Sequence, residues 1–158
     1  MTNPLKIFLV DNNPNFIHYQ ALLLKEMGID VLTCDKPDEA LCHIRDFDPD
    51  LLILDRLLDI GGLDIITEVK KNFEYLPVLV LGPAEVTCDK KEAYALGCID
   101  YLRRDIDAEV FMQRIKKYCH YGHITKQCAQ ISKRLDKSIN KLSSPCAALK
   151  RGPSGTGK

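Results

Sequence analysis

The stretch Asp50-Leu51-Leu52-Ile53-Leu54-Asp55 places four consecutive apolar residues between two acids. So short an apolar run is typical of a strand that is buried on both faces of a parallel sheet, because a helix of ordinary length needs more residues. Open α/β sheets bind their ligands in the crevice at the carboxyl ends of the strands. Asp55 follows the end of this strand, and it is therefore the first candidate for chemistry.

Four further short apolar runs alternate with segments of helical periodicity on either side of this stretch. The predicted strands are 5–10, 31–34, 51–54, 78–81 and 99–102. The predicted helices are 14–27, 37–47, 63–72, 88–96 and 107–118. Five strands and five helices that alternate through short loops predict an α/β fold, a doubly wound, flavodoxin-like parallel sheet of order 2-1-3-4-5.

This strand order brings the ends of the first and third strands together. Asp11 and Asn12 follow the first strand, so with Asp55 they are expected to converge on one small acidic pocket. The alternative is that Asp11 only caps a turn and that Asp55 is simply solvated. Two acids that both follow buried strands favour the pocket over this alternative.

Composition and cysteine content are those of an ordinary intracellular protein. No apolar run approaches 18 residues and the amino terminus lacks a signal-peptide core, so the chain is expected to be cytoplasmic, without a membrane partner. The seven cysteines form no Cys-x-x-Cys pair, which favours reduced thiols. Cys119, His120 and His123 lie close together, but a fourth ligand is missing, so no metal site is expected there.

The zero net charge hides a strong asymmetry. Residues 1–112 carry 11 basic and 21 acidic side chains, whereas residues 113–158 carry 11 basic and one acidic side chain. We therefore predict a domain at 1–121, a basic helical linker at 122–145 with its helix at 123–142, and a separate start at 146–158. Nucleic acid is not expected as a partner, since the basic part lacks interleaved aromatics and any complete DNA-binding motif.

Residues 5–120 resemble the receiver domain of two-component response regulators, through L-V-D-N-N-P, D-L-L-I-L-D, P-V-L-V-L-G and A-L-G-C-I-D-Y-L-R-R in this order. The resemblance implies that Asp55 accepts a phosphoryl group from a histidine kinase or phosphotransfer protein. It also implies that Mg²⁺ is held by Asp11, Asp55 and the backbone carbonyl of Leu57. Asn12 stands where the family usually has a second acid and offers only a neutral carbonyl or a bound water, so weak metal binding is expected.

Other departures from the family pattern affect the same site. Gly82 replaces the usual Thr or Ser, which removes a hydroxyl that would bind a phosphoryl oxygen. Arg104 replaces the usual Lys; it keeps the charge but has a planar, forked shape. Asp59 replaces a Pro that often follows the acceptor. Tyr101 matches the switch aromatic of the family, but its coupling to Asp55 is in question without a hydroxyl at 82.

Two functions therefore remain open for the predicted domain. In the first, Asp55 is phosphorylated in phosphorelay signalling; in the second, a pseudo-receiver acts by protein contact alone. The resemblance also implies a homodimer or partner face on the fourth and fifth helices and the fifth strand. A flavodoxin-like electron carrier would share the sheet order, but the first strand is not followed by a hydroxyl-rich phosphate loop.

The last residues form an incomplete nucleotide-binding motif. A predicted short strand at 146–149 precedes G-P-S-G-T-G-K, in which Gly152, Gly157 and Lys158 match the phosphate-cradling loop. This order resembles the start of the AAA+ domain of bacterial enhancer-binding response regulators, so the chain is predicted to be the amino-terminal part of a transcriptional activator. The metal-binding Ser or Thr and the catalytic acids are missing, so neither ATPase nor other enzyme activity is expected; a P-loop ATPase fragment remains the alternative.

Overall fold

The computed structural model describes residues 3–55, 63–83 and 87–143, except the side chains of 87–89. The strands are β1 (Lys6–Val10), β2 (Asp30–Cys34), β3 (Leu51–Asp55), β4 (Val78–Gly82) and β5 (Asp100–Arg103). The helices are α1 (Pro14–Glu26), α2 (Ala40–Phe47), α3 (Asp64–Asn72), α4 (Thr87–Leu96) and α5 (Ala108–Leu142). A 3-10 turn, η1 (Pro37–Glu39), leads into α2.

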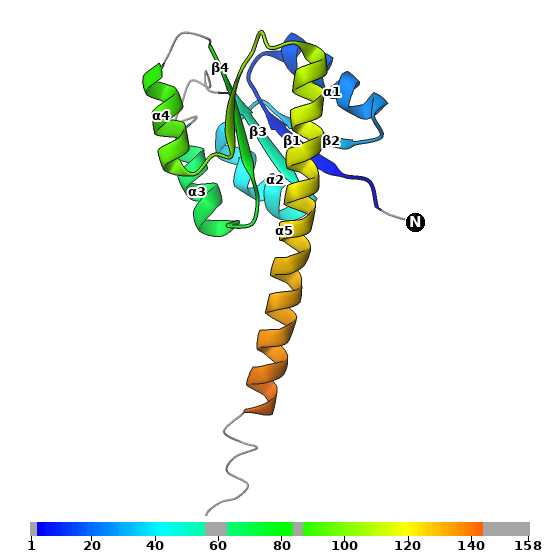
Figure 1. The fold of residues 1–158 in the computed structure, drawn as a ribbon, viewed down its shortest axis with the longest axis vertical. Helices are drawn as coiled ribbons and strands as arrows, with labels where there is room; N and C mark the ends of the chain where they lie inside the picture. The colour runs from blue at the N-terminus through cyan, green and yellow to red at the C-terminus, as the bar shows by residue number, and fades with distance from the viewer. Residues whose placement is uncertain (1–2, 56–62, 84–86, 144–158) are drawn as a thin grey trace, which may run out of the picture. The chain divides into compact units, whose positions relative to one another are not determined.

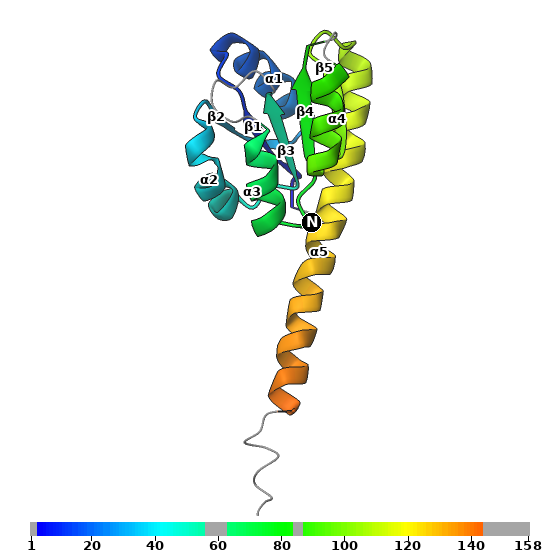
Figure 2. The ribbon, with the colours of Figure 1, turned by 90° about the vertical axis from the view of Figure 1, so that its left-hand side faces the viewer.

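The five strands form one parallel sheet of order β2-β1-β3-β4-β5 (Figure 1). This confirms the predicted fold, and β3 lies at its centre with all five residues buried. Helices cover both faces of the sheet, α1 and α5 on one side and α2, α3 and α4 on the other (Figure 2). Successive side chains of a strand point to opposite faces, so the continuous apolar runs fill both cores.

The chain turns from β1 into α1 as the sequence predicts. Asn13 caps the helix, because its side-chain oxygen accepts the backbone N–H groups of Asn15 at 3.1 Å and Phe16 at 3.2 Å. Pro14 then takes the first helical position, where its missing N–H costs nothing. This tight start places the first turn of α1 directly beside the carboxyl end of β1.

The structure differs from the sequence prediction at α5. The sequence predicts one helix at 107–118 and a separate helix at 123–142, whereas in the structure one helix runs from Ala108 to Leu142. Gly122 lies within it at a close approach: a Cβ there would overlap the backbone oxygen of Asp50 and lie 2.8 Å from its carbonyl carbon. The glycine therefore serves helix packing rather than helix termination.

A buried ionic cluster holds this part of α5 against the amino end of β3. Asp50 is 1% exposed, and its Oδ2 accepts the backbone N–H of Lys6 at 2.8 Å. Its Oδ1 lies 2.8 Å from Lys126 Nζ and 3.1 Å from His123 Nδ1. The Thr125 hydroxyl adds a hydrogen bond to the backbone oxygen of Tyr75 at 2.9 Å. We call Asp50, His123 and Lys126 the Asp50 anchor.

The chain divides into two compact units, residues 1–126 and residues 127–158. In the second unit the described residues 127–142 are helical and carry exposed apolar side chains at Ile131, Leu135, Ile139 and Leu142. None of the helices in the described part of the chain is long and apolar enough to cross a membrane. The predicted strand at 146–149 lies outside the described residues.

Candidate functional site at the carboxyl edge of the sheet

The two acids that the strand order was expected to bring together do meet. Asp11 follows β1 and Asp55 ends β3, and these neighbouring strands pair with Val10 opposite Leu54. Both carboxyl side chains are almost fully buried, Asp11 at 0% and Asp55 at 1% exposure. A charge in such a position is stable only with a partner, so the site needs a cation.

Arg104 supplies that positive charge in the structure. Its Nη1 lies 2.5 Å from Asp55 Oδ1 and its Nη2 lies 3.1 Å from Asp11 Oδ2. One guanidinium group therefore spans both carboxylates, which a compact ammonium group cannot do with the same geometry. The backbone holds Arg104 in place as well, since its N–H donates to the backbone oxygen of Gly82 at 3.0 Å.

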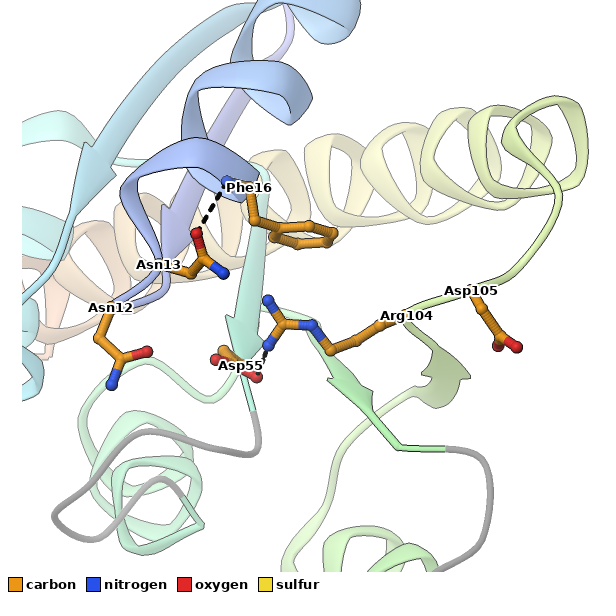
Figure 3. Close-up of a pocket in the computed structure, with 6 residues that line it drawn as sticks. All are labelled: Asn12, Asn13, Phe16, Asp55, Arg104 and Asp105. Carbon is orange, nitrogen blue, oxygen red and sulfur yellow. Dashed lines mark hydrogen bonds and ion pairs between the residues drawn. The ribbon is translucent and has the colours of Figure 1, made fainter.

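Phe16 fixes the other side of the guanidinium. The Arg104 Cζ lies 4.2 Å from the centre of the Phe16 ring, a cation–π contact, and Figure 3 shows the guanidinium between this ring and Asp55. Such a contact on a partly buried cation contributes on the order of 1 kcal/mol. Sequence reasoning missed Phe16, because only its place in the first turn of α1, three residues after the cap Asn13, aims the ring at this pocket.

The pKa of Asp11 is raised to about 6 at this site. Burial is the main cause, and the neighbouring Asp55 carboxyl adds to it, both by its charge and by a hydrogen bond. The backbone N–H of Asn13, which donates to Asp11 Oδ1 at 2.8 Å, and the Arg104 charge act in the opposite direction. Because one cation faces two buried acids, the site favours the binding of a further positive charge.

An open pocket of about 480 Å³ gives access to these groups. Its walls are formed by Asn12, Asn13, Phe16, Asp55, Arg104 and Asp105. The exposed Asn12 stands at the rim, and Figure 3 shows Asp105 pointing away from Asp55. Leu57, Asp59 and the loop-motif residues Gly152, Gly157 and Lys158 lie outside the described residues.

Tyr101 fills the space above Gly82. A Cβ added to Gly82 would overlap the Tyr101 hydroxyl oxygen and lie 2.5 Å from Cζ and 3.1 Å from Cε1 of the ring. Tyr101 is accordingly only 6% exposed. The absence of a side chain at 82 is therefore what permits the inward position of the tyrosine, and the two residues form one packing unit.

The donor set fits a divalent cation that prefers oxygen ligands. Asp11 Oδ2 and Asp55 Oδ1 already turn toward one positive charge, and Asn12 offers a carbonyl at the pocket rim. Mg²⁺ binds through one or two carboxylates and keeps several waters, for which an open pocket leaves room. A metal ion at this place would share the two carboxylates with Arg104, which contacts one oxygen of each.

A doubly wound sheet of order 2-1-3-4-5 with paired acids at its switch point defines a flavodoxin-like domain with an acidic pocket rather than a phosphate loop. The family model of the response regulator receiver domain matches residues 7–116. The chain belongs to this family, the receiver domains of two-component systems.

Individual relatives agree with this assignment. The transcriptional regulatory protein TrcR of Mycobacterium tuberculosis is 28% identical over 115 residues, 72% of this chain and 45% of TrcR. The alkaline phosphatase synthesis transcriptional regulatory protein PhoP of Bacillus subtilis is 27% identical over 127 residues, 80% of this chain and 53% of PhoP. The chain thus spans about half the length of these curated relatives.

Solved structures share the fold. A putative response regulator from Chloroflexus aurantiacus is 26% identical with a TM-score of 0.70, over 75% of this chain and 99% of that one. NtrX from Brucella abortus, crystallised in complex with ADP, has a TM-score of 0.72 at 24% identity, over 85% of this chain and 30% of NtrX. At this identity the NtrX match concerns the fold alone.

Proposed function

We propose that this receiver accepts a phosphoryl group on Asp55 from the phosphohistidine of a histidine kinase or phosphotransfer protein. The observation that carries the proposal is the buried Asp55 carboxylate at the end of β3, which lines an open pocket with Arg104 and shares that guanidinium with Asp11. Receivers act as acceptors in signalling rather than as classical enzymes, so the expected product is a phosphorylated chain.

In the proposed transfer an Asp55 oxygen attacks phosphorus while the phosphorus–nitrogen bond of the phosphohistidine breaks. The new bond is an acyl phosphate, and the imidazole of the donor leaves with the bond's electron pair and takes up a proton. Arg104 is close enough to the acceptor oxygen to neutralise charge on the phosphoryl oxygens. Mg²⁺, when bound by Asp11, Asp55 and the Leu57 carbonyl with help from Asn12, supplies further neutralisation.

A second candidate function, a pseudo-receiver that signals by protein contact alone, is favoured by two features. Arg104 occupies both carboxylates at once, at 2.5 Å and 3.1 Å. Tyr101 occupies the space in which a hydroxyl at position 82 would stand. In this second reading the site is held in one conformation by its own side chains, and phosphorylation has little left to change.

Beryllofluoride, which mimics a phosphoryl group on a carboxylate, separates the two candidates. Amide NMR spectra of the wild-type chain, Asp55→Asn and Arg104→Lys are compared during titration with beryllofluoride at millimolar Mg²⁺. The acceptor function predicts saturable shifts around Asp55 in the wild type and none in Asp55→Asn. Shifts that appear only in Arg104→Lys support the pseudo-receiver, in which Arg104 blocks the site. The absence of shifts in both the wild type and Arg104→Lys refutes the acceptor function.

The face formed by α4, β5 and α5 is proposed as a homodimer or partner surface. Asp100 ties the three elements together: its carboxylate accepts hydrogen bonds from Tyr94 of α4 at 2.9 Å, Arg114 of α5 at 2.7 Å and Tyr118 of α5 at 2.5 Å. Sedimentation equilibrium of the wild-type chain with and without beryllofluoride tests this proposal. A monomer over the whole accessible concentration range under both conditions would refute the homodimer.

We further propose that residues 122–145 link the receiver to an AAA+ output domain that starts at 146–158, as in transcriptional activators. What supports this is the sequence G-P-S-G-T-G-K alone, which lies outside the described residues. Residues 146–158 hold the phosphate loop without the Ser or Thr and the helix amino terminus that bind phosphate beside it, so titration with ATP is expected to give no micromolar binding. Micromolar affinity would favour the alternative of a functional P-loop fragment.

A further inference from the structure

A second group of metal-ligating side chains lies at the outer edge of the sheet, away from the paired acids. Cys34 ends β2, Glu39 ends η1, and His43 lies in the first turns of α2. Their ligand atoms, a thiol sulfur, a carboxylate oxygen and an imidazole nitrogen, lie within 4.8 Å of one another. In the described ranges this is the one group of three or more such residues that is so close.

The Cys34 thiol is hydrogen-bonded to the backbone of Lys36, two residues further along the chain. Cys34 is 8% exposed, the Lys36 N–H donates to its sulfur at 3.4 Å, and its S–H donates to the Lys36 carbonyl oxygen, with 3.2 Å between sulfur and oxygen. An N–H group aimed at sulfur stabilises the thiolate, which is the form that binds metal.

The other two ligands share one face of a helical segment. Glu39 and His43 are four residues apart, and Glu39 Oε2 lies 3.8 Å from His43 Nε2. The His43 ring packs edge-on against Phe8, with centroids 5.9 Å apart, which restricts its orientation. A metal ion needs only small side-chain rotations, because backbone and packing already bring all three groups together.

The surrounding charge favours a cation. Burial raises the pKa of the Cys34 thiol, and the negative charges of Glu39, Asp35 and Asp38 raise it further. The same negative field attracts a divalent ion. Lys36 pairs with Glu39 at 3.7 Å, but both side chains are more than half exposed, so this ion pair is weak and easily replaced.

We propose that Cys34, Glu39 and His43 bind a borderline-soft divalent transition metal of the Zn²⁺ type. Sulfur and nitrogen ligands select against Mg²⁺, which takes oxygen ligands, and three protein ligands leave the fourth tetrahedral position to water or a further group. Binding exchanges the thiol proton for the metal, so the proton goes to solvent and affinity rises with pH. The proposal does not rest on phosphorylation of Asp55.

This metal site is one hydrogen bond away from the acidic pocket. The backbone N–H of Asp11 donates to the backbone oxygen of Cys34 at 3.1 Å. A metal that fixes Cys34 therefore also restrains the residue that precedes Asn12 in the pocket. This contact provides a second readout, since the Asp11 amide resonance should move when the metal binds at Cys34.

The experiment uses Co²⁺ as the probe on the reduced, metal-free full chain without oxygen. A cobalt–thiolate charge-transfer absorption that saturates at one equivalent is expected in the wild type, together with visible bands of four-coordinate Co²⁺. Zn²⁺ should then displace the cobalt. Cys34→Ser should remove the charge-transfer absorption, and His43→Asn and Glu39→Gln should each weaken binding at least about tenfold.

Cys42→Ser is the matched control, because Cys42 is an exposed thiol on α2 next to His43 but outside the group. It should behave like the wild type. If Cys34→Ser does not fold, the half-exposed Glu39 and His43 carry the test, since their substitution leaves the core intact. Equal cobalt spectra in the wild type and Cys34→Ser, or no saturable thiolate band in the wild type, would show adventitious binding and overturn the proposal.

Discussion

Replacing Asp50 by asparagine should destabilise the receiver far more than an ordinary loss of one surface charge. Asp50 is 1% exposed and offers its two oxygens to three donors, the backbone N–H of Lys6 and the side chains of His123 and Lys126. An asparagine keeps one acceptor oxygen, and its amide group would face a donor. The substitution also leaves the Lys126 ammonium, whose side chain is 11% exposed, without its closest counter-charge.

The expected magnitude follows from this geometry. Removal of one partner of a buried ion pair costs about 3–5 kcal/mol, a large share of the roughly 5–15 kcal/mol that stabilises a domain. With a urea m-value of about 1–3 kcal/mol per molar, the unfolding midpoint should fall by on the order of 2 M. Urea unfolding followed by circular dichroism measures this shift directly.

Asp46→Asn is the control, since it makes the same chemical change at an exposed position of α2 and should stay within about 0.5 kcal/mol of the wild type. The double variant Asp50→Asn with Lys126→Met completes a cycle in which the two losses should not add, because they remove the same pair. A loss below about 1 kcal/mol for Asp50→Asn, or simple additivity, would show that the Asp50 anchor does not hold α5.

Three further predictions concern the packing at Gly82, the pKa of Asp11 and the hydrogen bonds of Asp100. Gly82→Thr should expel the Tyr101 ring at a cost of about 1–3 kcal/mol, seen as a change in the ring's NMR shifts; unchanged shifts would contradict the packing described. Asp11 should titrate near pH 6, and Arg104→Gln should raise the Asp11 pKa further because a positive charge is lost. Since the pKa of Asp11 is higher in the folded than in the unfolded chain, its contribution to stability is lost as pH rises through about 6. A carboxyl NMR titration of Asp11 with a midpoint near pH 4 would refute this. Burial alone would raise the pKa of Asp100, but the hydrogen bonds that its carboxylate accepts outweigh burial and lower this pKa. The stabilising effect of Asp100 is therefore present at neutral pH and lost as pH falls through the pKa of the folded state. Asp100→Asn should flatten this decline in stability at acid pH, measured by urea unfolding.

The fold could be predicted because its signal is local and repeated. Five short apolar runs separated by helical segments leave few topologies, and the right-handed connection rule then places the ends of β1 and β3 side by side. The meeting of Asp11 with Asp55 follows from that topology alone, without any knowledge of side-chain conformation. For this reason the centre of the candidate site was found at the sequence level.

The remaining contacts depend on conformations that no periodicity encodes. The place of Arg104 between two acids and Phe16 depends on the rotamers of long side chains from distant parts of the chain. The continuity of α5 was missed because the change in charge along the chain was taken for a domain boundary, whereas Gly122 allows the helix to continue in close contact with Asp50. Asp50 itself was read only as the polar flank of a strand.

The pair of Gly82 and Tyr101 also has an evolutionary consequence. While the ring occupies the space next to Gly82, a substitution to a hydroxyl-bearing residue at 82 meets a steric penalty at the first step. Such a substitution becomes favourable only after Tyr101 has turned outward or been replaced by a smaller residue. The order of the two substitutions therefore decides whether this receiver can acquire a hydroxyl at position 82.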